Sequence, residues 1–375
     1  MKVVLMLQFY FPFGGLQRDC VKMAGLLAAN GHEVTILTRS WEGETPEEVE
    51  VQVLGARGLS NVAMDQNFDQ DAAAWLNTKV VNAVIGFSRM ETTMDFYYAA
   101  DPCYRLRIER DRSLFYRLSR KFRYYAGLEQ KLFEAGGDTH LLLLTGMEVP
   151  EYVARYGTEE SRITVLPPGI RKRELLMDAK LEIRAKVRAD MGWPDDLPVV
   201  LFVGSGFATK GLDRAIRACG AMPGRVKFVV AGDGKTGKYQ QLAKQVGVGD
   251  KVDFLGARDD AWELMVAADL MIHPARSENT GTVLVEALSA GTGVLTTDRC
   301  GFANHVTSSG SGHVLVSPFD QDALNHSLER MISEPWQQRA EKALLYAETE
   351  DLYSGMDAGV RQIEMFLANG GRVGS

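Results

Sequence analysis

Short apolar runs alternate with amphipathic segments of helical length along most of the 375 residues. The first half begins with an apolar run, a loop rich in Pro and Gly, an amphipathic segment and a second apolar run, at Val3–Leu7, 11–15, Leu16–Asn30 and Val34–Leu37. Continuous apolar runs of this length are typical of parallel strands that are buried on both faces. The pattern therefore predicts an α/β fold with parallel sheets.

The second half repeats this arrangement. A strand, a Gly-rich loop, a helix and another strand are expected at Val199–Val203, Gly204–Gly211, Leu212–Cys219 and Val226–Val230. Two halves that begin alike, in a chain too long for one ordinary core, predict two Rossmann-like domains. The paired prolines at 167 and 168 mark the boundary. We expect one Rossmann-like domain at 1–168, completed by a helix at about 353–375, and a second at 169–352. Ligands of such sheets bind beyond the carboxyl ends of the strands, so both Gly-rich loops should line one deep cleft between facing domains.

Composition narrows the classes of site. The four cysteines are far apart and no Cys/His cluster is present, which argues against structural zinc and a disulfide framework and fits a reducing cytosol. No metal cofactor is therefore expected. None of the apolar runs approaches the roughly 20 residues of a membrane span. Gln8 and the loop after it break the first run early, so we interpret that run as a strand rather than a signal peptide.

The stretch Ser277–Glu286, SENTGTVLVE, places two acids around a turn-prone polar segment. One interpretation is the start of a helix, capped by Asn279 or Thr280 and with Glu278 near the positive end of the dipole. The alternative is a ligand site, in which both acids and the helix N-terminus hold different parts of one anionic molecule. Neither Gly-rich loop matches GxGxxG or GxxxxGK[ST], which disfavours nicotinamide binding and P-loop phosphotransfer.

The E-x7-E pattern of Glu278 and Glu286, with Leu166–Ile170 and Lys210–Asp213 before it, resembles the family 4 retaining glycosyltransferases. These enzymes have the GT-B fold of two facing Rossmann-like domains, which implies an acceptor-binding domain at 1–168 and a nucleotide-sugar-binding domain at 169–352. The loop Phe11–Asp19, FPFGGLQRD, further resembles the glucosyltransferases of the bacterial lipopolysaccharide core. The resemblance covers nearly the whole chain. It implies transfer of glucose from UDP-glucose to an inner-core heptose, with retention and without a metal. The alternatives are another nucleotide-sugar donor or glycolipid acceptor, or a non-catalytic nucleotide-sugar-binding protein.

The resemblance also implies roles in the second domain. Lys210 is expected to neutralise the leaving diphosphate, and a solvated surface lysine is the plainer interpretation. Glu278 is expected to bind hydroxyls of the donor sugar and Glu286 the two ribose hydroxyls; an ion-paired helix acid is the alternative for Glu286. Thr209 stands where many relatives carry a basic residue. The remaining donor-binding candidates are Arg173, Gly206, Thr209, Asn279, Thr280 and Gly281.

In the first domain, the Gly-rich loop supplies Gly14 and Gly15 as further binding candidates. Asp19 follows the loop and is expected on the same side of the cleft, unless it is only an acid at the start of a helix. Asp101 follows the apolar and aromatic run 96–100, at the end of an expected strand. There it either assists deprotonation of the acceptor hydroxyl or only orients the acceptor. A turn-forming aspartate before Pro102 is the alternative.

Residues 104–131 form the most basic segment of the chain. They contain nine basic and three acidic residues, a net charge of +6, whereas the remainder of the chain carries −13. Leu, Phe and Tyr residues are interleaved with the cations, which on a helix is typical of a face attracted to anionic lipid. The acceptor's own phosphates are a second candidate partner, and nucleic acid is disfavoured because the acidic remainder would repel it. We expect association with the cytoplasmic face of the inner membrane, through Arg105, Arg107, Arg110, Arg117, Arg120, Lys121 and Arg123.

Overall fold

The computed structural model describes residues 1–12, 14–55, 57–222, 224 and 226–372. Phe13, within the first Gly-rich loop, lies outside the described residues. The chain divides into two compact units: unit 1 is Met1–Pro167 with Ser354–Ser375, and unit 2 is Pro168–Tyr353. These boundaries lie beside those expected from the prolines, whereas the assigned roles of the two domains and the cleft between them stay predictions.

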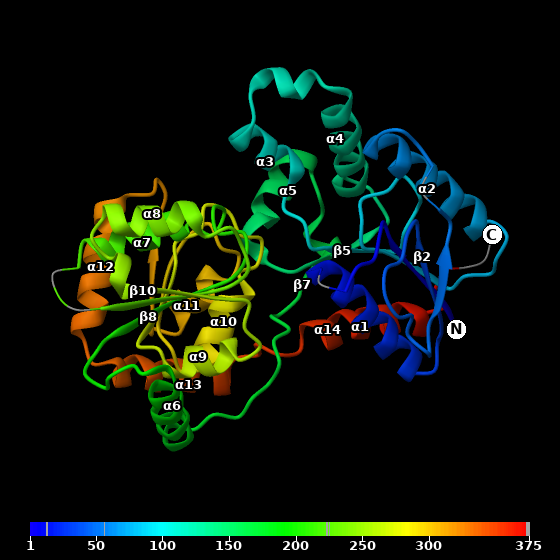
Figure 1. Ribbon diagram of the computed structural model, residues 1–375. Coiled ribbons are helices and arrows are strands. Elements are labelled where there is room, and N and C mark those ends of the chain that lie inside the picture. Colours follow the sequence, from blue (N-terminus) through cyan, green and yellow to red (C-terminus); the bar gives the residue numbers. More distant parts are fainter. Residues whose placement is uncertain (13, 56, 223, 225, 373–375) are drawn as a thin grey trace. The chain divides into compact units, whose positions relative to one another are not determined.

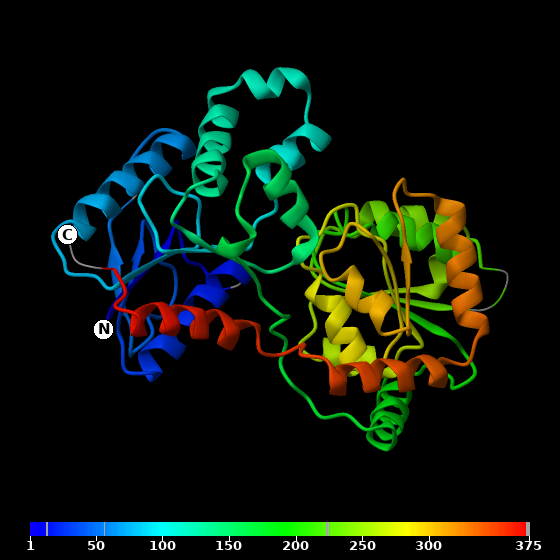
Figure 2. The same cartoon turned by 180° about the vertical axis from the view of Figure 1, so that it is seen from behind.

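Unit 1 contains a parallel sheet in the strand order β3-β2-β1-β4-β5-β6-β7. Its strands are β1 (Lys2–Leu7), β2 (Glu33–Thr38), β3 (Glu50–Val53), β4 (Ala83–Gly86), β5 (Phe96–Ala99), β6 (His140–Leu143) and β7 (Ile163–Val165). Its helices are α1 (Gly15–Ala29), α2 (Asn61–Leu76), α3 (Tyr104–Asp111), η1 (Leu114–Leu118), α4 (Arg120–Phe133), η2 (Gly146–Glu148), α5 (Val149–Tyr156), η3 (Glu160–Arg162) and α14 (Gly355–Ala368). The C-terminal α14 lies beside α1 in both views (Figure 1, Figure 2).

The first strand shows why its sequence is continuously apolar. Val3, Leu5 and Leu7 belong to one core cluster, which includes side chains from α1 and α14. Val4 and Met6 point to the opposite face of the sheet and join a second cluster, with side chains from α2 and α5. Because successive strand residues alternate between faces, a strand covered on both sides needs an apolar residue at every position.

Unit 2 contains a parallel sheet in the strand order β10-β9-β8-β11-β12-β13. Its strands are β8 (Val199–Val203), β9 (Lys227–Ala231), β10 (Val252–Gly256), β11 (Leu270–His273), β12 (Val294–Thr297) and β13 (His313–Leu315). Its helices are α6 (Met177–Met191), α7 (Leu212–Gly220), α8 (Gly237–Gln245), η4 (Gly249–Lys251), α9 (Ala261–Ala267), α10 (Thr282–Ser289), α11 (Ala303–Ser308), α12 (Gln321–Ser333) and α13 (Trp336–Thr349). Figure 1 shows helices on both faces of this sheet.

Each sheet has one point at which the chain changes direction across it. In unit 1 the chain runs outward from β1 to β3 and then returns to place β4 on the other side of β1. In unit 2 the same change separates β8 from β11. Loops that follow the two central strands diverge at such a point and leave room for a ligand at the carboxyl edge. The sites are therefore expected after β1 and β4 in unit 1, and after β8 and β11 in unit 2.

Most expected elements agree closely with those observed, but the C-terminal helix expected at about 353–375 is α14, which ends at Ala368, and the basic segment differs as well. The strand expected at Val199–Val203 has those bounds, and the expected helix at Leu16–Asn30 is α1, one residue earlier at each end. The segment 104–131 is not one helix. It consists of α3, the short 3₁₀ helix η1 and α4, with non-helical residues between α3 and η1. Ser119 caps α4, because its side chain accepts from the N–H of Phe122.

Candidate functional site

The loop between β8 and α7 holds the Lys210 side chain against glycine backbone. Gly204, Gly206 and Gly211 all have positive φ, which glycine adopts most readily. A Cβ on Gly204 would lie 2.8 Å from Cδ of Lys210, so the lysine stem needs a glycine there. A Cβ on Gly211 would lie 2.1 Å from the carbonyl oxygen of Pro274, in the loop after β11. The two loops therefore pack backbone against backbone, as the neighbouring positions of β8 and β11 require.

The same two loops bring Lys210 and Glu278 together. The Lys210 ammonium donates to Oε2 of Glu278 in a short ion-paired hydrogen bond. Each side chain is about one-fifth exposed, at 21%. The pair is thus partly withdrawn from water, where charge-assisted hydrogen bonds are stronger than on an open surface. Lys210 and Glu278, which were predicted to act on the diphosphate and on the donor sugar, consequently meet at the carboxyl edge of the unit 2 sheet.

The charge state of Glu278 follows from these neighbours. Burial acts to raise the pKa of its carboxyl, but the nearby His273 ring and the Lys210 ammonium lower it more, to about 2. His273 is the last residue of β11, and its Nε2 lies 3.8 Å from Oε2 of Glu278. That distance is too long for a hydrogen bond, so the contact is electrostatic at this separation. Glu278 is therefore a carboxylate at neutral pH.

A second ion pair joins the two loops. The backbone N–H of Arg276 donates to the carbonyl oxygen of Thr209 at 2.7 Å, and its guanidinium donates to that of Ala208 at 2.9 Å. The same guanidinium binds both carboxylate oxygens of Asp213 in α7, at 2.8 and 2.7 Å. Sequence reasoning missed the roles of Arg276 and Asp213. The pairing of an arginine before SENTGTVLVE with an acid after Lys210 becomes evident only when β8 and β11 are neighbours.

Helix α10 begins differently from the expectation. Asn279 and Thr280 were the expected caps, but the cap position is held by Gly281, with φ of 73° and no side-chain cap hydrogen bond among the described residues. The Thr280 carbonyl accepts from the N–H of Phe302 at 2.7 Å, so this residue is committed to another loop. Because Gly281 has no side chain over the first turn, the backbone N–H groups of that turn are approachable by an anion.

The remaining donor-binding candidates lie in different surroundings. Gly206 makes the turn before Lys210 and accepts from the Thr209 N–H at 3.0 Å. Glu286 lies in α10, half-buried. Arg173 has other partners: it binds Oε1 of Glu263 at 3.0 Å and lies 4.5 Å over the ring of Trp262, both at the start of α9. The structure thus places five of the candidates in the two neighbouring loops, namely Gly206, Thr209, Lys210, Glu278 and Gly281. Arg173 instead pairs with Glu263.

In unit 1, the loop after β1 leads into α1 through two glycines. Gly14 is the cap residue, and a Cβ on it would collide with the Gln17 side chain at 1.9 Å, whereas a Cβ on Gly15 would meet nothing within 4 Å. Asp19 lies in the second turn of α1 and accepts from the hydroxyl of Tyr98 in β5 at 3.0 Å. Burial raises the pKa of Asp19, and Tyr98 partly offsets this effect. Asp19 is therefore packed against the strand that ends at Ala99.

Asp101 follows β5 and is exposed. The backbone of the segment that carries it is held by hydrogen bonds to other side chains. The Arg89 guanidinium donates to the carbonyl oxygens of Asp101 and Pro102, at 3.4 and 2.8 Å. Glu129 of α4, which is fully buried, accepts from the N–H groups of Tyr104 and Arg105 at the start of α3. Arg89 also lies 3.3 Å from this carboxylate, which compensates the cost of burying it.

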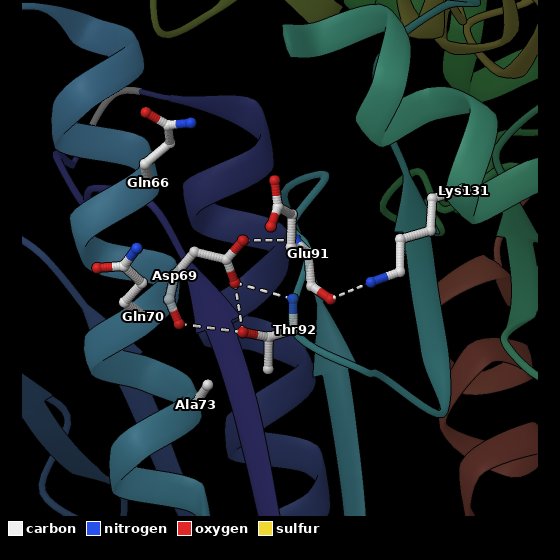
Figure 3. Close-up of a pocket in the computed structure, with 7 residues that line it drawn as sticks. All are labelled: Gln66, Asp69, Gln70, Ala73, Glu91, Thr92 and Lys131. Carbon is white, nitrogen blue, oxygen red and sulfur yellow. Dashed lines mark hydrogen bonds between the residues drawn. The ribbon is translucent and has the colours of Figure 1, made fainter.

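Asp69 of α2 organises the connection between β4 and β5, beside a pocket of about 250 Å³ (Figure 3). Its carboxylate accepts from the N–H groups of Glu91 and Thr92, the latter at 2.9 Å. Lys131 of α4 donates to the carbonyl oxygen of Glu91 at 2.8 Å from the other side of the pocket. These contacts hold the loop that carries Arg89 between α2 and α4.

The basic segment stands out from the sheet of unit 1 in both views (Figure 1, Figure 2). Two of the predicted surface cations turn toward the protein: Arg105 lies 5.9 Å from the Tyr156 ring centroid, and Arg117 donates to the carbonyl oxygen of Glu109 at 3.3 Å. The other predicted cations are exposed, namely Arg107, Arg110, Arg120, Lys121 and Arg123. The 3₁₀ helix between them exposes three large apolar side chains, Leu114, Phe115 and Leu118.

In the described part of the chain, no helix is both long and apolar enough to span a bilayer. No group of three or more His, Cys, Asp and Glu side chains among the described residues could hold a metal ion. The expectation that the reaction uses no metal stays a prediction.

Comparison with known proteins identifies the family. The family profile described as "Glycosyl transferases group 1" matches residues 183–348. The lipopolysaccharide glucosyltransferase WaaG of Escherichia coli K12 is 37% identical over 363 residues, which cover 94% of this chain and 96% of WaaG. A crystal structure of WaaG, described as a glycosyltransferase involved in lipopolysaccharide biosynthesis, matches with a TM-score of 0.85 and 36% identity, over 96% of this chain and 99% of that one.

A more distant structure shares only the fold. Sucrose-phosphate synthase from Thermosynechococcus elongatus matches with a TM-score of 0.74 at 18% identity, over 98% of both chains. Together with the full-length relation to WaaG, this confirms the fold class and the family expected from the E-x7-E pattern. The chain therefore belongs to the group 1 glycosyl transferases and is a glycosyltransferase built from two parallel-sheet α/β domains of the GT-B fold.

Proposed function

We propose that this glycosyltransferase moves glucose from UDP-glucose to an inner-core heptose of lipopolysaccharide, with retention of the anomeric configuration. The observation that carries the donor half is the meeting of Lys210 and Glu278 beside the N-terminus of α10. A cation and approachable N–H groups suit a diphosphate, and a carboxylate next to them suits sugar hydroxyls. The full-length relation to WaaG, whose name specifies a lipopolysaccharide glucosyltransferase, supports the choice of sugar and acceptor.

The chemistry requires stabilisation of two developing charges. Negative charge grows on the leaving diphosphate as the glycosidic bond breaks, and Lys210 with the α10 N-terminus opposes it. Positive charge grows at the anomeric carbon, next to the Glu278 carboxylate. Glu286 holds the ribose diol, and Asp101 contacts the acceptor hydroxyl as a base or as an orienting group. Neither role of Asp101 requires a metal.

The donor is tested by incubating the purified enzyme with UDP-glucose, UDP-galactose and GDP-mannose, without acceptor, and measuring release of the nucleotide. We expect the fastest hydrolysis with UDP-glucose. With a heptose-terminated lipopolysaccharide as acceptor, the anomeric proton of the product should have the small coupling of an α-linkage. A β-linked product would rule out retention, and equal hydrolysis of all three donors would leave glucose unsupported as the donor sugar.

The ribose assignment is tested with Glu286→Ala. Loss of charge-assisted hydrogen bonds worth about 1.5–3 kcal/mol should raise the KM for UDP-glucose roughly ten- to a hundredfold. Glu329→Ala, which removes an exposed acid of α12, is the matched control and should not change the KM. If Glu286→Ala bound UDP-glucose as tightly as the wild type, this role would be wrong.

We also propose that the segment from α3 to α4 binds the anionic cytoplasmic face of the inner membrane. Leu114, Phe115 and Leu118 are 72%, 83% and 74% exposed, on the short 3₁₀ helix between two basic helices. Apolar side chains of this kind enter the lipid interface, and the surrounding cations interact with anionic headgroups. The opposite combination, cations without exposed apolar residues, would fit a free polyanion better.

Sedimentation with vesicles tests the membrane proposal. Wild-type protein should sediment with vesicles that contain anionic lipid at low salt, and less at high salt because exposed charges are screened. The triple variant Leu114→Ser, Phe115→Ser, Leu118→Ser should lose most of this binding. A control triple variant of equally exposed positions, Leu59→Ser, Val80→Ser, Leu176→Ser, should retain it. Absence of wild-type binding at low salt would end the proposal.

A further inference from the structure

His273 is a buried polar residue whose ring has no hydrogen-bond partner. It is completely inaccessible to solvent at the carboxyl end of β11, and its ring stacks on Phe202 with centroids 5.8 Å apart. Among the described residues, neither Nδ1 nor Nε2 has a partner within hydrogen-bond distance. Burial lowers the pKa of His273, so the ring is neutral at pH 7 and carries one N–H donor. A buried donor left unpaired is costly, which calls for a reason to retain a histidine here.

The Glu278 carboxylate lies close to that donor but already has another partner. His273 Nε2 lies 3.8 Å from Oε2 of Glu278, and Oε2 is the oxygen that accepts from the Lys210 ammonium. The backbone of Glu278 is held on both sides, since its N–H donates to the carbonyl oxygen of Arg299 at 2.9 Å and its own carbonyl accepts from Gly301 at 3.3 Å. Only the carboxylate can therefore move, and a shift of less than an ångström would bring it within reach of the histidine.

The donor supplies a reason for that shift. Lys210 and Glu278 are the cation and the anion that the proposed function assigns to the diphosphate and to the sugar, yet in this structure they bind each other. A diphosphate carries more negative charge than one carboxylate and draws the ammonium toward itself. Glu278 then loses its cation partner at the moment when it must be held in place for the sugar.

We propose that His273 is a positioning residue, which receives the Glu278 carboxylate from Lys210 when the donor diphosphate binds. The proposal deepens the proposed function and rests on it. In the free protein Lys210 and Glu278 bind each other, so neither charge is available to a ligand. In the donor complex, Lys210 binds phosphate, while Nε2–H of His273 donates to Glu278 and orients its other oxygen toward the sugar hydroxyls.

The test compares a ligand that contains the sugar with one that lacks it. His273→Phe keeps the aromatic stack on Phe202 and removes both nitrogens. We expect its Kd for UDP-glucose to rise about tenfold, the effect of one hydrogen bond to a charged group, while its Kd for UDP stays within twofold of wild type. His273→Gln keeps an N–H donor and should recover much of the loss. His305→Phe, at a half-buried histidine of unit 2 that contacts Tyr346, is the control and should change neither Kd.

A spectroscopic measurement follows the change of partner of the Glu278 carboxylate from Lys210 to His273. In wild-type protein with ¹⁵N-labelled histidine, saturating UDP-glucose should shift the Nε2 resonance of His273, because the diphosphate takes Lys210 and the sugar holds the released carboxylate against Nε2–H. UDP alone should shift it little, and an unchanged resonance at saturating UDP-glucose would overturn the proposal. So would equal weakening of UDP and UDP-glucose by His273→Phe, since that is the result of lost packing.

The outcome separates this inference from the proposed function. If wild-type protein binds UDP-glucose no more tightly than UDP, the role of Glu278 on the sugar fails, and the proposed function loses its basis. If wild-type protein prefers UDP-glucose and His273→Phe prefers it equally, the sugar site stands and only the role of His273 is wrong.

Discussion

At the scale of one residue, Lys180 shows how three helices of unit 2 are joined. This lysine of α6 is completely buried, and its ammonium donates to the carbonyl oxygens of Val266 and Ala290 at 2.8 and 2.9 Å. It thereby joins α6 to the ends of α9 and α10. Burial lowers its pKa from 10.5 to about 7, because the charged form is removed from water.

This shift predicts a pH dependence of stability. Between pH 7 and 10.5 the unfolded chain binds the Lys180 proton more tightly than the folded chain does, so the free energy of unfolding rises with pH in this range. The gain is at most about 1.4 kcal/mol per pH unit. Urea unfolding at pH 7, 8 and 9 should show the wild type gaining stability relative to Lys180→Met. Lys186→Met, an exposed position of the same helix, should follow the wild type, and parallel profiles for all three proteins would contradict the shift.

At the scale of elements, α3 and α4 are joined by one buried carboxylate. Glu129 of α4 accepts from the Tyr104 and Arg105 N–H groups of α3, at the end opposite to η1, and from the Tyr156 hydroxyl at 2.6 Å. Glu129 is thus connected to the backbone of Asp101 through Arg89, and to η1 only through α3. The start of α3 depends on this carboxylate as its cap.

Glu129→Gln tests that dependence. The amide keeps one acceptor oxygen but loses the charge that strengthens the bonds from the N–H groups of Tyr104 and Arg105. Local opening of α3 should become easier by about 1–3 kcal/mol, seen as faster hydrogen exchange of these two amides. Glu109→Gln disrupts only a surface pair with Arg155 and should leave the exchange unchanged. Equal protection in both variants would show that the carboxylate is not the cap.

At the scale of the whole molecule, unit 1 is completed by the last segment of the chain. Helix α14 contributes Met356, Val360, Ile363 and Leu367 to the core cluster that also contains side chains of β1 and α1. Gly359 of this helix faces Met23 of α1. A Cβ at position 359 would lie 3.4 Å from Cε of that methionine, which is ordinary contact distance. Unit 1 therefore needs residues that the chain reaches only after unit 2 is complete.

Ile363→Ala should consequently destabilise unit 1 and leave unit 2 unaffected. Ile363 is fully buried, and truncating such a side chain costs about 2–5 kcal/mol. Hydrogen exchange, read separately for peptides of residues 1–167 and 168–353, should show the loss only in the first set. Met365→Ala, on the same helix but 60% exposed, should have little effect. Equal loss of protection in both units would show that their stabilities are not separate.

The sequence was informative wherever a local pattern has one structural solution. A continuous apolar run followed by glycines predicts a buried parallel strand and a turn at its carboxyl end, and β8 begins and ends where that run does. Lys210, Glu278 and Gly281 could be selected because they lie within such loops. The cap of α10 could not be predicted, because Asn279, Thr280 and Gly281 are all acceptable in local terms and the bond from Phe302 to Thr280 decides between them.

The sequence by itself therefore determined the two sheets, their Gly-rich loops and the candidate residues, since these depend on periodicity and on backbone conformations that neighbouring residues set. Only the tertiary structure decided which residues meet. Lys210 and Glu278 are 68 positions apart and pair because β8 and β11 are adjacent strands. Glu129 looked like one more acid in a basic segment, and its burial depends on Arg89 from another loop. Long-range contacts of this kind follow from strand order and packing, which no local stretch of sequence contains.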